Sequence, residues 1–446
     1  MLLITASISV IILSIFIFKR SRNIGSNIAF FHPYCNAGGG GERVLWTAIQ
    51  GIQSLTPNIH VLVYTGDSDS KQTLINNAKT KMSIDLNPQT IHFVRLRCRF
   101  LVDDKSWPYF TLLGQAIGST ILIIEALYRK NDFSVFIDTM GYAFTYPIVR
   151  LVKSRARIVA YTHYPTISSD MVSRVEKRHN DITNSSTITS SNILSRGKLI
   201  YYHALISAYS FCLKTCDVNM ANSSWTGNHI RNLINREVKV VYPPCDTVAL
   251  RDFSLEGRRK SILCVAQFRP EKAHSTQIKA FKELRDSHTN HKDSKLILLG
   301  SARNQDDLNR VEHLKSLAKS LGVDSSTEFI VNASFKVLLH SLSTASIGIN
   351  TMVDEHFGIN VVEYMAAGLI PLAHASAGPL LDIIVDYKGS KTGYHAREVK
   401  EFSERMNDIF NLSEHDAIQV RQRARESVME RLSDKTFNGN FLDALN

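Results

Sequence analysis

The chain has 446 residues, 44% of them hydrophobic, so it is long enough for two or three domains with cores of ordinary size. Its net charge of +11 indicates an anionic partner, but the sequence has no nucleic-acid motif of the zinc-finger, RRM or KH kind. The six cysteines are scattered and none forms a C-x-x-C pair, which argues against a metal site and fits a reducing compartment.

The first 18 residues carry no charge and are followed by Lys19-Arg20-Ser21-Arg22. As a helix, this run is about 27 Å long, enough for a thin bilayer. A cleaved signal peptide is the competing interpretation, but its basic residue would precede the apolar run and a small-x-small site would follow it. We therefore expect 1–22 to be a transmembrane signal anchor. The positive-inside rule then places the rest of the chain in the cytosol.

Four glycines, 38 to 41, stand between a short apolar run and the helix-forming sequence after Arg43. Strand, glycine loop and helix form the first unit of a Rossmann-like domain, and glycines let the backbone approach a ligand closely. The loop is not a P-loop, because no Gly-Lys-Ser/Thr follows. It also lacks the acidic residue of a dinucleotide fingerprint about 20 positions on. A flexible linker is the alternative.

Two features farther along suit a membrane surface. Arg95, Arg97 and Arg99 alternate with apolar residues, so in a strand one face would be all arginine and would suit anionic headgroups or a lipid diphosphate. A second apolar stretch, 107–127, is interrupted by glycines and Gln115. We expect a helix in the core or in the membrane interface, with a second transmembrane helix as the alternative.

Other features of the sequence divide the chain into domains. His163 follows an expected strand, and a histidine there lies on the functional edge of an open α/β sheet. The polar segment 173–197 is typical of a mobile insertion, and Pro243-Pro244 ends the first domain. We expect an N-terminal Rossmann-like domain, a hinge, a second Rossmann-like domain and C-terminal helices that cross back to the first domain, over 27–243, 244–258, 259–415 and 416–446.

Arg269 and Lys272 follow the first strand of the expected second domain. An R-x-x-K pair on a surface helix is usually solvated. Two fixed cations at the end of a strand, however, can neutralise a diphosphate leaving group without a metal ion.

The stretch 354–379 contains two glutamates, Glu355 and Glu363, with seven residues between them. Gly358 marks a turn before a helix, whose free N–H groups and positive dipole end would suit a phosphate. Glu355 would stand just before that end and Glu363 two turns down, about 80° round. Carboxylates accept hydrogen bonds from hydroxyl groups, so the layout fits a nucleotide sugar. By spacing alone, an ordinary surface helix with two acids is an equal alternative.

With its flanking FG, AAG and AGP, this stretch resembles the E-x7-E signature of retaining glycosyltransferases of family 4. Those enzymes have the GT-B fold, in which two Rossmann-like domains face a cleft. The block FFHPYCNAGGGGERVLW, 30–46, resembles that of endoplasmic-reticulum α-1,2-mannosyltransferases that extend the dolichol-linked oligosaccharide. The resemblance covers 28–446 and implies an α/β chain of two Rossmann-like domains behind an N-terminal transmembrane helix.

The resemblance also implies roles for residues. Glu355 would contact the donor sugar, His163 would touch that sugar near the reacting carbon, and Arg269 with Lys272 would clamp the diphosphate; these four form the expected catalytic group. We expect no metal or other cofactor, and the alternative is a metal at Asp67-Ser68-Asp69, as in the other glycosyltransferase fold, GT-A. The expected donor-binding set contains Arg269, Lys272 and Glu355 and adds Gly38, Gly39, Gly40, Gly41, Asn332, Phe357, Gly358, Ile359 and Glu363, the last on the ribose.

The implied reaction transfers α-1,2-linked mannose from GDP-mannose to the trimannosyl-chitobiosyl-diphosphodolichol intermediate, as the fourth and fifth mannoses of the N-glycan precursor. The implied partners are this dolichol-linked oligosaccharide, the endoplasmic-reticulum membrane and other mannosyltransferases of the pathway, but no nucleic acid. A transferase acting on another lipid and a non-catalytic scaffold subunit are the alternatives. The side of the membrane on which the domains lie has a separate test. A lumenal domain would carry glycans on the N-x-Ser sequons at Asn184, Asn222, Asn332 and Asn411.

Overall fold

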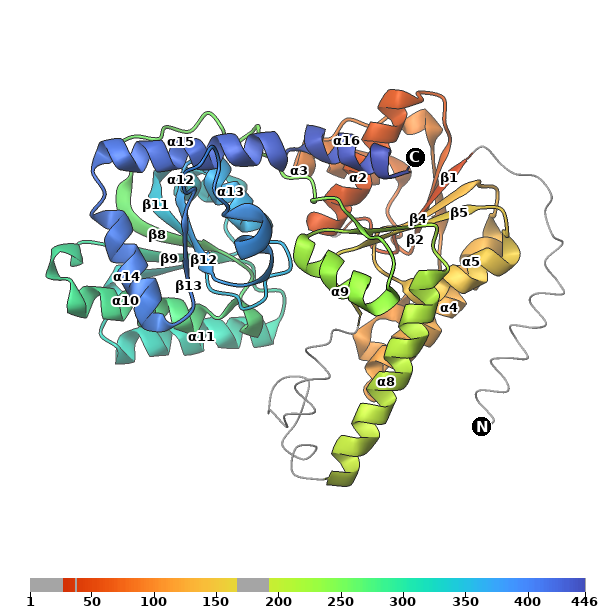
Figure 1. Cartoon of the computed structure of the whole chain (residues 1–446), viewed down its shortest axis with the longest axis horizontal. Coiled ribbons are helices and arrows are strands. Elements are labelled where there is room, and N and C mark those ends of the chain that lie inside the picture. Colours follow the sequence, from red (N-terminus) through yellow and green to blue (C-terminus); the bar gives the residue numbers. More distant parts are fainter. Residues whose placement is uncertain (1–26, 37, 167–191, 446) are drawn as a thin grey trace. The chain divides into compact units, whose positions relative to one another are not determined.

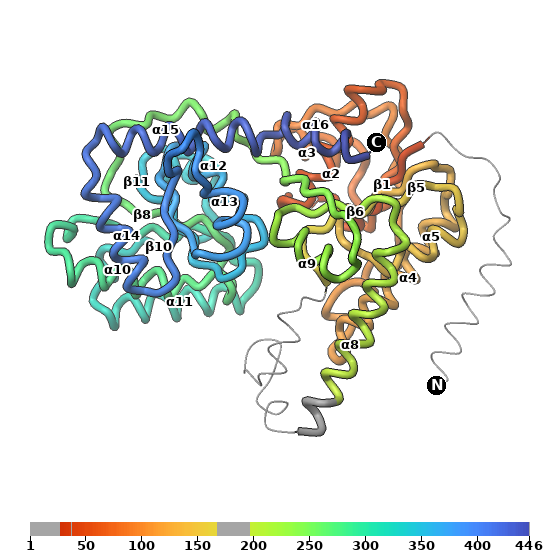
Figure 2. Tube along the Cα trace, viewed as in Figure 1, coloured from red at the N-terminus to blue at the C-terminus, as the bar shows by residue number. Residues whose placement is uncertain are grey.

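The computed structural model describes residues 27–36, 38–166 and 192–445. The expected anchor at 1–22 and most of the expected insertion at 173–197 lie outside these residues. The chain divides into two compact units (Figures 1 and 2). Unit 1 runs to residue 222 and adds 226–241 and the end of the chain from 438, whereas unit 2 holds 223–225 and 242–437.

Unit 1 is built on a parallel sheet in the spatial order β3-β2-β1-β4-β5-β6-β7. The first six strands have the order of a Rossmann fold, which brings the carboxyl ends of the strands to one edge. The inner strands are buried on both faces and accordingly have almost purely apolar sequences. The described strands are β1 (Ile28–Phe31), β2 (Val61–Thr65), β3 (Ile91–Arg95), β4 (Val135–Asp138), β5 (Arg157–Thr162), β6 (Val218–Ala221) and β7 (Lys239–Val240).

Helices cover both faces of this sheet, with α4, α5 and α8 on one face and α2, α3 and α16 on the other (Figure 1). Helix α16 approaches α2 closely at Asn438, since a Cβ on Gly51 would lie 2.6 Å from the Asn438 side chain. The helices are α2 (Gly40–Leu55), α3 (Lys71–Met82), α4 (Thr111–Arg129), α5 (Tyr146–Val152), α8 (Asn192–Lys214), α9 (Ser224–Ile234) and α16 (Asp434–Leu445).

Helix α4 occupies the second apolar stretch and is long and apolar enough to cross a membrane by length and composition. It packs on the sheet instead, through Leu122, Ile123, Ala126 and Leu127. Its opposite side leaves Leu113, Ile117 and Ile121 about 40% exposed, at helical spacing. The helix is thus a core element on one side, with an apolar stripe on the other.

Unit 2 has a second parallel sheet, in the order β10-β9-β8-β11-β12-β13. Helices α10, α11 and α14 pack on one face and α12 and α13 on the other, whereas α15 contributes Ala417 and Val420 to the first core and Ala424 and Val428 to the second. The strands are β8 (Arg259–Val265), β9 (Lys295–Gly300), β10 (Thr327–Val331), β11 (Ala345–Asn350), β12 (Ile370–His374) and β13 (Tyr394–Ala396). The helices are α10 (His274–Ser287), α11 (Gln305–Ser320), α12 (Phe335–Thr344), α13 (Ile359–Ala367), α14 (Val399–Phe410) and α15 (Glu414–Arg431).

The α/β prediction of two Rossmann-like domains is confirmed by these two sheets, and three local predictions are wrong. Helix α2 begins at Gly40, so Gly40 and Gly41 are helical rather than loop residues. Helix α8 begins at Asn192, inside the segment expected to be an irregular insertion. Strand β3 ends at Arg95 and a 3₁₀ turn begins at Cys98, so no all-arginine strand face forms.

Candidate active site

Lys272 and Glu355 meet at the carboxyl edge of the sheet in unit 2. Lys272 closes a 3₁₀ turn after β8, and Glu355 follows β11 by five residues. The Lys272 Nζ lies 2.5 Å from Glu355 Oε2, and the two side chains are 23% and 12% exposed. Asn350, at the end of β11, donates from its amide to the same carboxylate oxygen at 3.3 Å. The structure therefore brings two of the expected catalytic residues into direct contact.

The loop that carries Glu355 is shaped by two glycines. Gly358 has φ +109°, a left-handed conformation that suits glycine, and it starts α13. Gly378 donates its N–H to the Glu355 carbonyl at 3.0 Å. A Cβ on Gly378 would lie 2.4 Å from the Phe357 carbonyl oxygen, so only glycine fits there. These contacts fix where Glu355 stands before the first turn of α13.

The residues predicted to bind the donor around the start of α13 differ in burial and in the atoms that they offer. The Phe357 side chain is buried and stacks on Tyr242, 5.9 Å away, so only the backbone of Phe357 can face a ligand. Ile359 begins the helix, where the first N–H groups have no partner within the helix and suit an anion. Glu363 is half-buried farther along the same helix. The structure therefore contains the helix N-terminus that the prediction needs, and its binding of an anion stays a prediction.

Arg269 stands at the start of the turn that Lys272 closes. Its Nε is buried and has no hydrogen-bond partner among the described residues. Its Nη1 lies 3.8 Å from Glu271, a long ion pair at a partly exposed site. Buried guanidinium N–H groups are rarely left unpaired, so the orphaned Nε and the partly exposed guanidinium make Arg269 a candidate to bind an anion such as a phosphate.

Asn332 follows β10 and has the left-handed φ of +55°. Its side-chain oxygen accepts the N–H of Ala302 at 3.0 Å, and its own N–H donates to the Gly300 carbonyl at 2.9 Å. Asn332 therefore ties together the loops after β9 and β10. Its side chain is engaged in this way, so a ligand at this loop would meet backbone atoms rather than the Asn332 amide, and the predicted donor contact of Asn332 stays a prediction.

In unit 1, two histidines gather around the first turn of α2. His32 follows β1 and His163 follows β5. His32 Nδ1 lies 2.7 Å from the Thr139 hydroxyl, and His163 Nε2 lies 3.0 Å from the Thr139 carbonyl. A Cβ on Gly41 would lie 3.8 Å from His163 and 3.9 Å from His32. Gly41 and His163, predicted separately, therefore belong to one cluster.

The electrostatics of this cluster favour neutral imidazoles. Burial lowers the pKa of His163 to about 4 and that of His32 to about 3. A neutral His163 whose Nε2–H donates to the Thr139 carbonyl keeps Nδ1 as an acceptor for a hydroxyl group. The first turn of α2 is closed by Glu42, which accepts the N–H of Gly39 at 2.7 Å. Burial raises the pKa of Glu42.

The Asp67-Ser68-Asp69 segment holds the loop before α2 in place. Asp67 accepts the backbone N–H of Asn36 at 3.0 Å and pairs with Arg99 at 2.5 Å, and Asp69 accepts the Asn36 amide at 2.9 Å. Arg95 donates to the carbonyl oxygens of both aspartates. Two of the arginines expected to face lipid thus turn toward this loop, and only Arg97 is exposed. No group of three or more metal-ligating side chains occurs among the described residues.

Sequence reasoning missed a polar network beneath the Lys272–Glu355 pair. The Asn350 amide also donates to the Asn360 side chain at 3.1 Å, and Asn360 donates to the Val265 carbonyl at 3.1 Å. The buried Tyr364 hydroxyl accepts the Val265 N–H at 2.6 Å. Gly348 makes room for this ring, since a Cβ there would lie 2.2 Å from it. The sequence signal that could have indicated this network is Asn350, an asparagine at the carboxyl end of the buried strand β11.

The two sheets and the site in unit 2 define a glycosyltransferase of the GT-B fold. The family model "Glycosyl transferases group 1" matches residues 249–427, and "ALG11 mannosyltransferase N-terminus" matches residues 25–234. Among solved structures, Anabaena HepE in complex with UDP and glucose has a TM-score of 0.64 at 14% identity, covering 94% of this chain and 99% of that one. Sucrose-phosphate synthase from Thermosynechococcus elongatus has a TM-score of 0.65 at 13% identity, covering 94% and 98%. Identities this low establish the fold only.

Curated relatives define the family more closely. The mouse protein named GDP-Man:Man(3)GlcNAc(2)-PP-Dol alpha-1,2-mannosyltransferase is 44% identical over 93% of this chain and 85% of its own length. Proteins of the same name from human and from Dictyostelium discoideum are 44% and 41% identical, covering 94% and 93% of this chain and 86% and 83% of their own lengths. The chain belongs to this family of α-1,2-mannosyltransferases.

Proposed function

We propose that this enzyme transfers mannose from GDP-mannose, in α-1,2 linkage and with retention, to the trimannosyl-chitobiosyl-diphosphodolichol intermediate, adding the fourth and fifth mannoses. The names of the relatives support the donor and the acceptor. The observation that carries the chemistry is the Lys272–Glu355 pair, with the unpartnered Arg269 Nε on the same turn.

In this proposal, the residues of unit 2 handle the donor. Arg269 and Lys272 neutralise the diphosphate as it leaves, because the charge that develops there needs compensation more than a proton. Glu355 orients the mannosyl group and strengthens its hold as positive charge develops on the sugar. Glu363 accepts hydrogen bonds from the ribose hydroxyls, and the backbone N–H groups at the start of α13 contact phosphate oxygens.

The reaction has a defined proton path. The acceptor hydroxyl attacks the anomeric carbon on the face that the diphosphate leaves, so the departing phosphate oxygen takes the hydroxyl proton. The bond from the anomeric carbon to the phosphate oxygen breaks as the new glycosidic bond forms, and GDP is the second product. For unit 1 we assign residues 38–41 and His163 to sugar binding, with the neutral His163 accepting a hydrogen bond from a sugar hydroxyl.

The experiment is an assay of the purified full-length chain with GDP-mannose and the trimannosyl lipid. We expect two additions, with UDP- and ADP-sugars inactive. A chain that makes no product with this pair but transfers another sugar would overturn the proposed specificity. In this proposal Arg269 and Lys272, rather than a metal ion, neutralise the diphosphate. Adding EDTA at roughly 5 mM, an excess over trace metal, should therefore keep the rate within about twofold of the rate without EDTA.

We also propose that the chain is a single-pass protein of the endoplasmic-reticulum membrane, with both units in the cytosol. The apolar run before Lys19 supports the anchor, and the basic flank supports the orientation. Asn411 is exposed, so a lumenal enzyme would present its sequon to the glycosylation machinery. Expression in membranes followed by endoglycosidase treatment should give no change in mobility, whereas a shift would place unit 2 in the lumen.

A further inference from the structure

Asn350 is a buried asparagine at the carboxyl end of β11, and each polar atom of its side chain has a partner. The amide nitrogen donates to Glu355 Oε2 at 3.3 Å and to the Asn360 side-chain oxygen at 3.1 Å. The amide oxygen accepts the backbone N–H of Met352 at 3.0 Å. A flipped amide would turn its oxygen toward the Glu355 carboxylate and its nitrogen toward an N–H group. These contacts therefore fix the donor end of the amide against Glu355.

Asn360, in the first turn of α13, is itself held in a fixed orientation. Its amide nitrogen donates to the carbonyl of Val265, the last residue of β8, at 3.1 Å and to the Tyr364 hydroxyl at 3.4 Å. Tyr364 is fully buried, and its hydroxyl accepts the Val265 N–H at 2.6 Å. The Asn360 oxygen is therefore the atom that faces Asn350. Residues of β8, β11 and α13 together present one fixed amide N–H to the Glu355 carboxylate.

The two residues that follow Asn350 contact Lys272, the cation that pairs with Glu355. The Thr351 hydroxyl is buried and lies 3.2 Å from the Lys272 carbonyl oxygen. The Met352 sulfur lies 3.2 Å from the Lys272 Nζ. Three consecutive residues, 350–352, therefore contact both members of the Lys272–Glu355 pair, the first through the carboxylate and the next two through the lysine.

Lys272 and Asn350 donate to the same oxygen, Glu355 Oε2, but only the lysine is charged. In the proposed reaction, an arriving diphosphate competes with Glu355 for the Lys272 ammonium. The Asn350 amide carries no charge to draw it toward the phosphate, and both of its N–H groups are already engaged. Hydrogen bonds to a charged acceptor are stronger than those between neutral groups. Asn350 therefore keeps its hold on the Glu355 carboxylate when the ammonium turns to the phosphate.

We propose that Asn350 is a positioning residue of the transfer reaction: it holds the Glu355 carboxylate in place for the donor sugar while Lys272 binds the diphosphate. The inference rests on the roles that the proposed function gives to Glu355 and Lys272. Asn350 acts through Glu355 and touches neither the sugar nor the phosphate in this scheme. A change at Asn350 should therefore affect kcat only where the Glu355 carboxylate is present.

The test is a double-mutant cycle on the full-length chain in detergent, assayed with GDP-mannose and the trimannosyl lipid. N350D keeps the size of the side chain and an oxygen for the Met352 N–H, but it turns an acceptor toward Glu355. We expect kcat to fall about 10- to 100-fold, with KM for GDP-mannose within about threefold of the wild type. In the E355Q background the same change should cost less than about twofold. N350A removes the donor without adding a charge, should lower kcat about tenfold, and serves if N350D does not fold.

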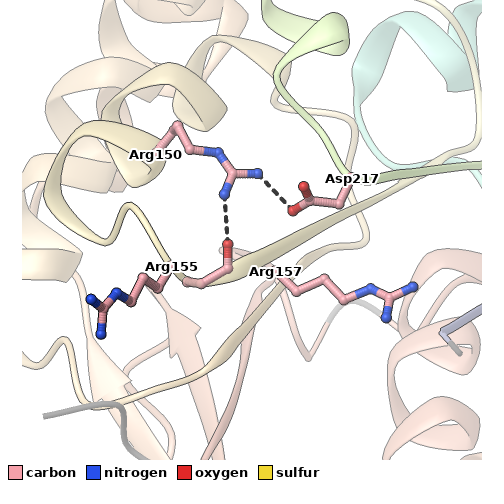
Figure 3. A pocket seen from close by; sticks show the side chains of 5 residues that line it. Arg150, Arg155, Arg157 and Asp217 are labelled. Atoms are coloured by element: carbon pink, nitrogen blue, oxygen red, sulfur yellow. Dashed lines mark hydrogen bonds and ion pairs between the residues drawn. The ribbon is translucent and has the colours of Figure 1, made fainter.

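Thermal unfolding of the same proteins separates positioning from folding. N350D/E355Q again places a donor opposite an acceptor, so it should recover stability relative to N350D without recovering kcat. The control is D217N in unit 1, where Asp217 accepts from Arg150 at 2.6 Å beside an open hollow of about 320 Å³ (Figure 3). D217N weakens an ion pair that the proposed reaction does not use. It should lower the unfolding temperature and leave kcat within about twofold of the wild type.

Two outcomes would overturn the inference. One is an equal loss of kcat from N350D with and without the Glu355 carboxylate, and the other is a rise in KM with kcat unchanged. The proposed function fails separately, if the wild type turns over UDP-glucose and not GDP-mannose. The same cycle measured with UDP-glucose would then still decide whether Asn350 acts through Glu355.

Discussion

The Lys272 ammonium lies 2.5 Å from a Glu355 carboxylate oxygen, although 83 positions separate the two residues in the sequence. Each belongs to a turn that follows a strand of the same sheet, and both are largely shielded from solvent. When no sugar nucleotide is bound, the Lys272 ammonium neutralises the Glu355 carboxylate. A diphosphate that binds Lys272 competes for that cation, which would free Glu355 for the sugar hydroxyls. Under the proposed function, the pair would thus couple binding of the diphosphate to binding of the sugar.

Replacing Glu355 by Gln should lower kcat by about 10²- to 10³-fold, because the carboxylate acts on charge that develops only in the transition state. KM for GDP-mannose should change far less. Steady-state kinetics in detergent micelles measure both constants. E271Q removes an exposed carboxylate 3.8 Å from Arg269 and should stay within about twofold of the wild type. Full activity of E355Q would remove Glu355 from the catalytic group.

Removing the two partners singly and together should reveal their coupling. K272A leaves the shielded Glu355 carboxylate without its cation, and should lower the free energy of unfolding by about 1–3 kcal/mol. K272A/E355A should be destabilised by about 1–2 kcal/mol less than the sum of the single variants, since residues in contact are not additive. Urea unfolding followed by fluorescence gives the four free energies. Additive values would mean that the contact contributes nothing to folding.

Gly378→Ala should damage the loop that positions Glu355. Its Cβ would lie 2.4 Å from the Phe357 carbonyl oxygen, and backbone must shift to relieve the contact. We expect a loss of about 1–3 kcal/mol in stability and at least tenfold in kcat. Thermal unfolding and the mannosyl-transfer assay test the two effects. The matched control is Gly439→Ala in α16, where a Cβ meets no atom within 4 Å, and it should be neutral or slightly stabilising. Equal behaviour of the two variants would refute the close-contact argument.

The fold and the donor residues could be predicted because their signals are local. Short apolar runs define most of the strands, and Gly358 and Gly368 mark both ends of α13 in sequence. The contact between Lys272 and Glu355 could not be derived in this way. It depends on β8 and β11 being neighbours in the sheet, and strand order is a long-range property that spacing does not encode.

The wrong predictions have a related cause. Arg95, Arg97 and Arg99 have strand-like alternation, but the strand ends at Arg95, and Arg95 and Arg99 contact the carbonyl oxygens of Asp67 and Asp69 and the Asp67 carboxylate. By their conformational propensity, Gly40 and Gly41 were expected to be loop residues. They are helical because Glu42 reaches back to the Gly39 N–H and starts the helix early. In both cases a tertiary or capping contact prevails over local preference.

The last prediction concerns the dependence of stability on pH. The pKa of His32 is about 3, below its ordinary value of 6.5, so the folded state favours the neutral ring. Its contribution is complete above pH 6.5 and is lost as the pH falls, at up to about 1.4 kcal/mol per pH unit for one proton. Asp138 acts in the opposite direction, because burial raises its pKa to about 6, so the comparison must be between variants.

Urea unfolding at pH 7, 6 and 5 should therefore show His32→Asn losing less stability toward low pH than the wild type does. The difference in slope should be about 1.4 kcal/mol per pH unit between pH 6 and 5. His163→Asn, in the same cluster, removes a ring whose pKa is about 4 and should act in the same direction, which keeps the test usable if His32→Asn does not fold. Parallel slopes for both variants and the wild type would mean that the two rings titrate alike in the folded and unfolded chains, and that burial beside Gly41 does not hold them neutral.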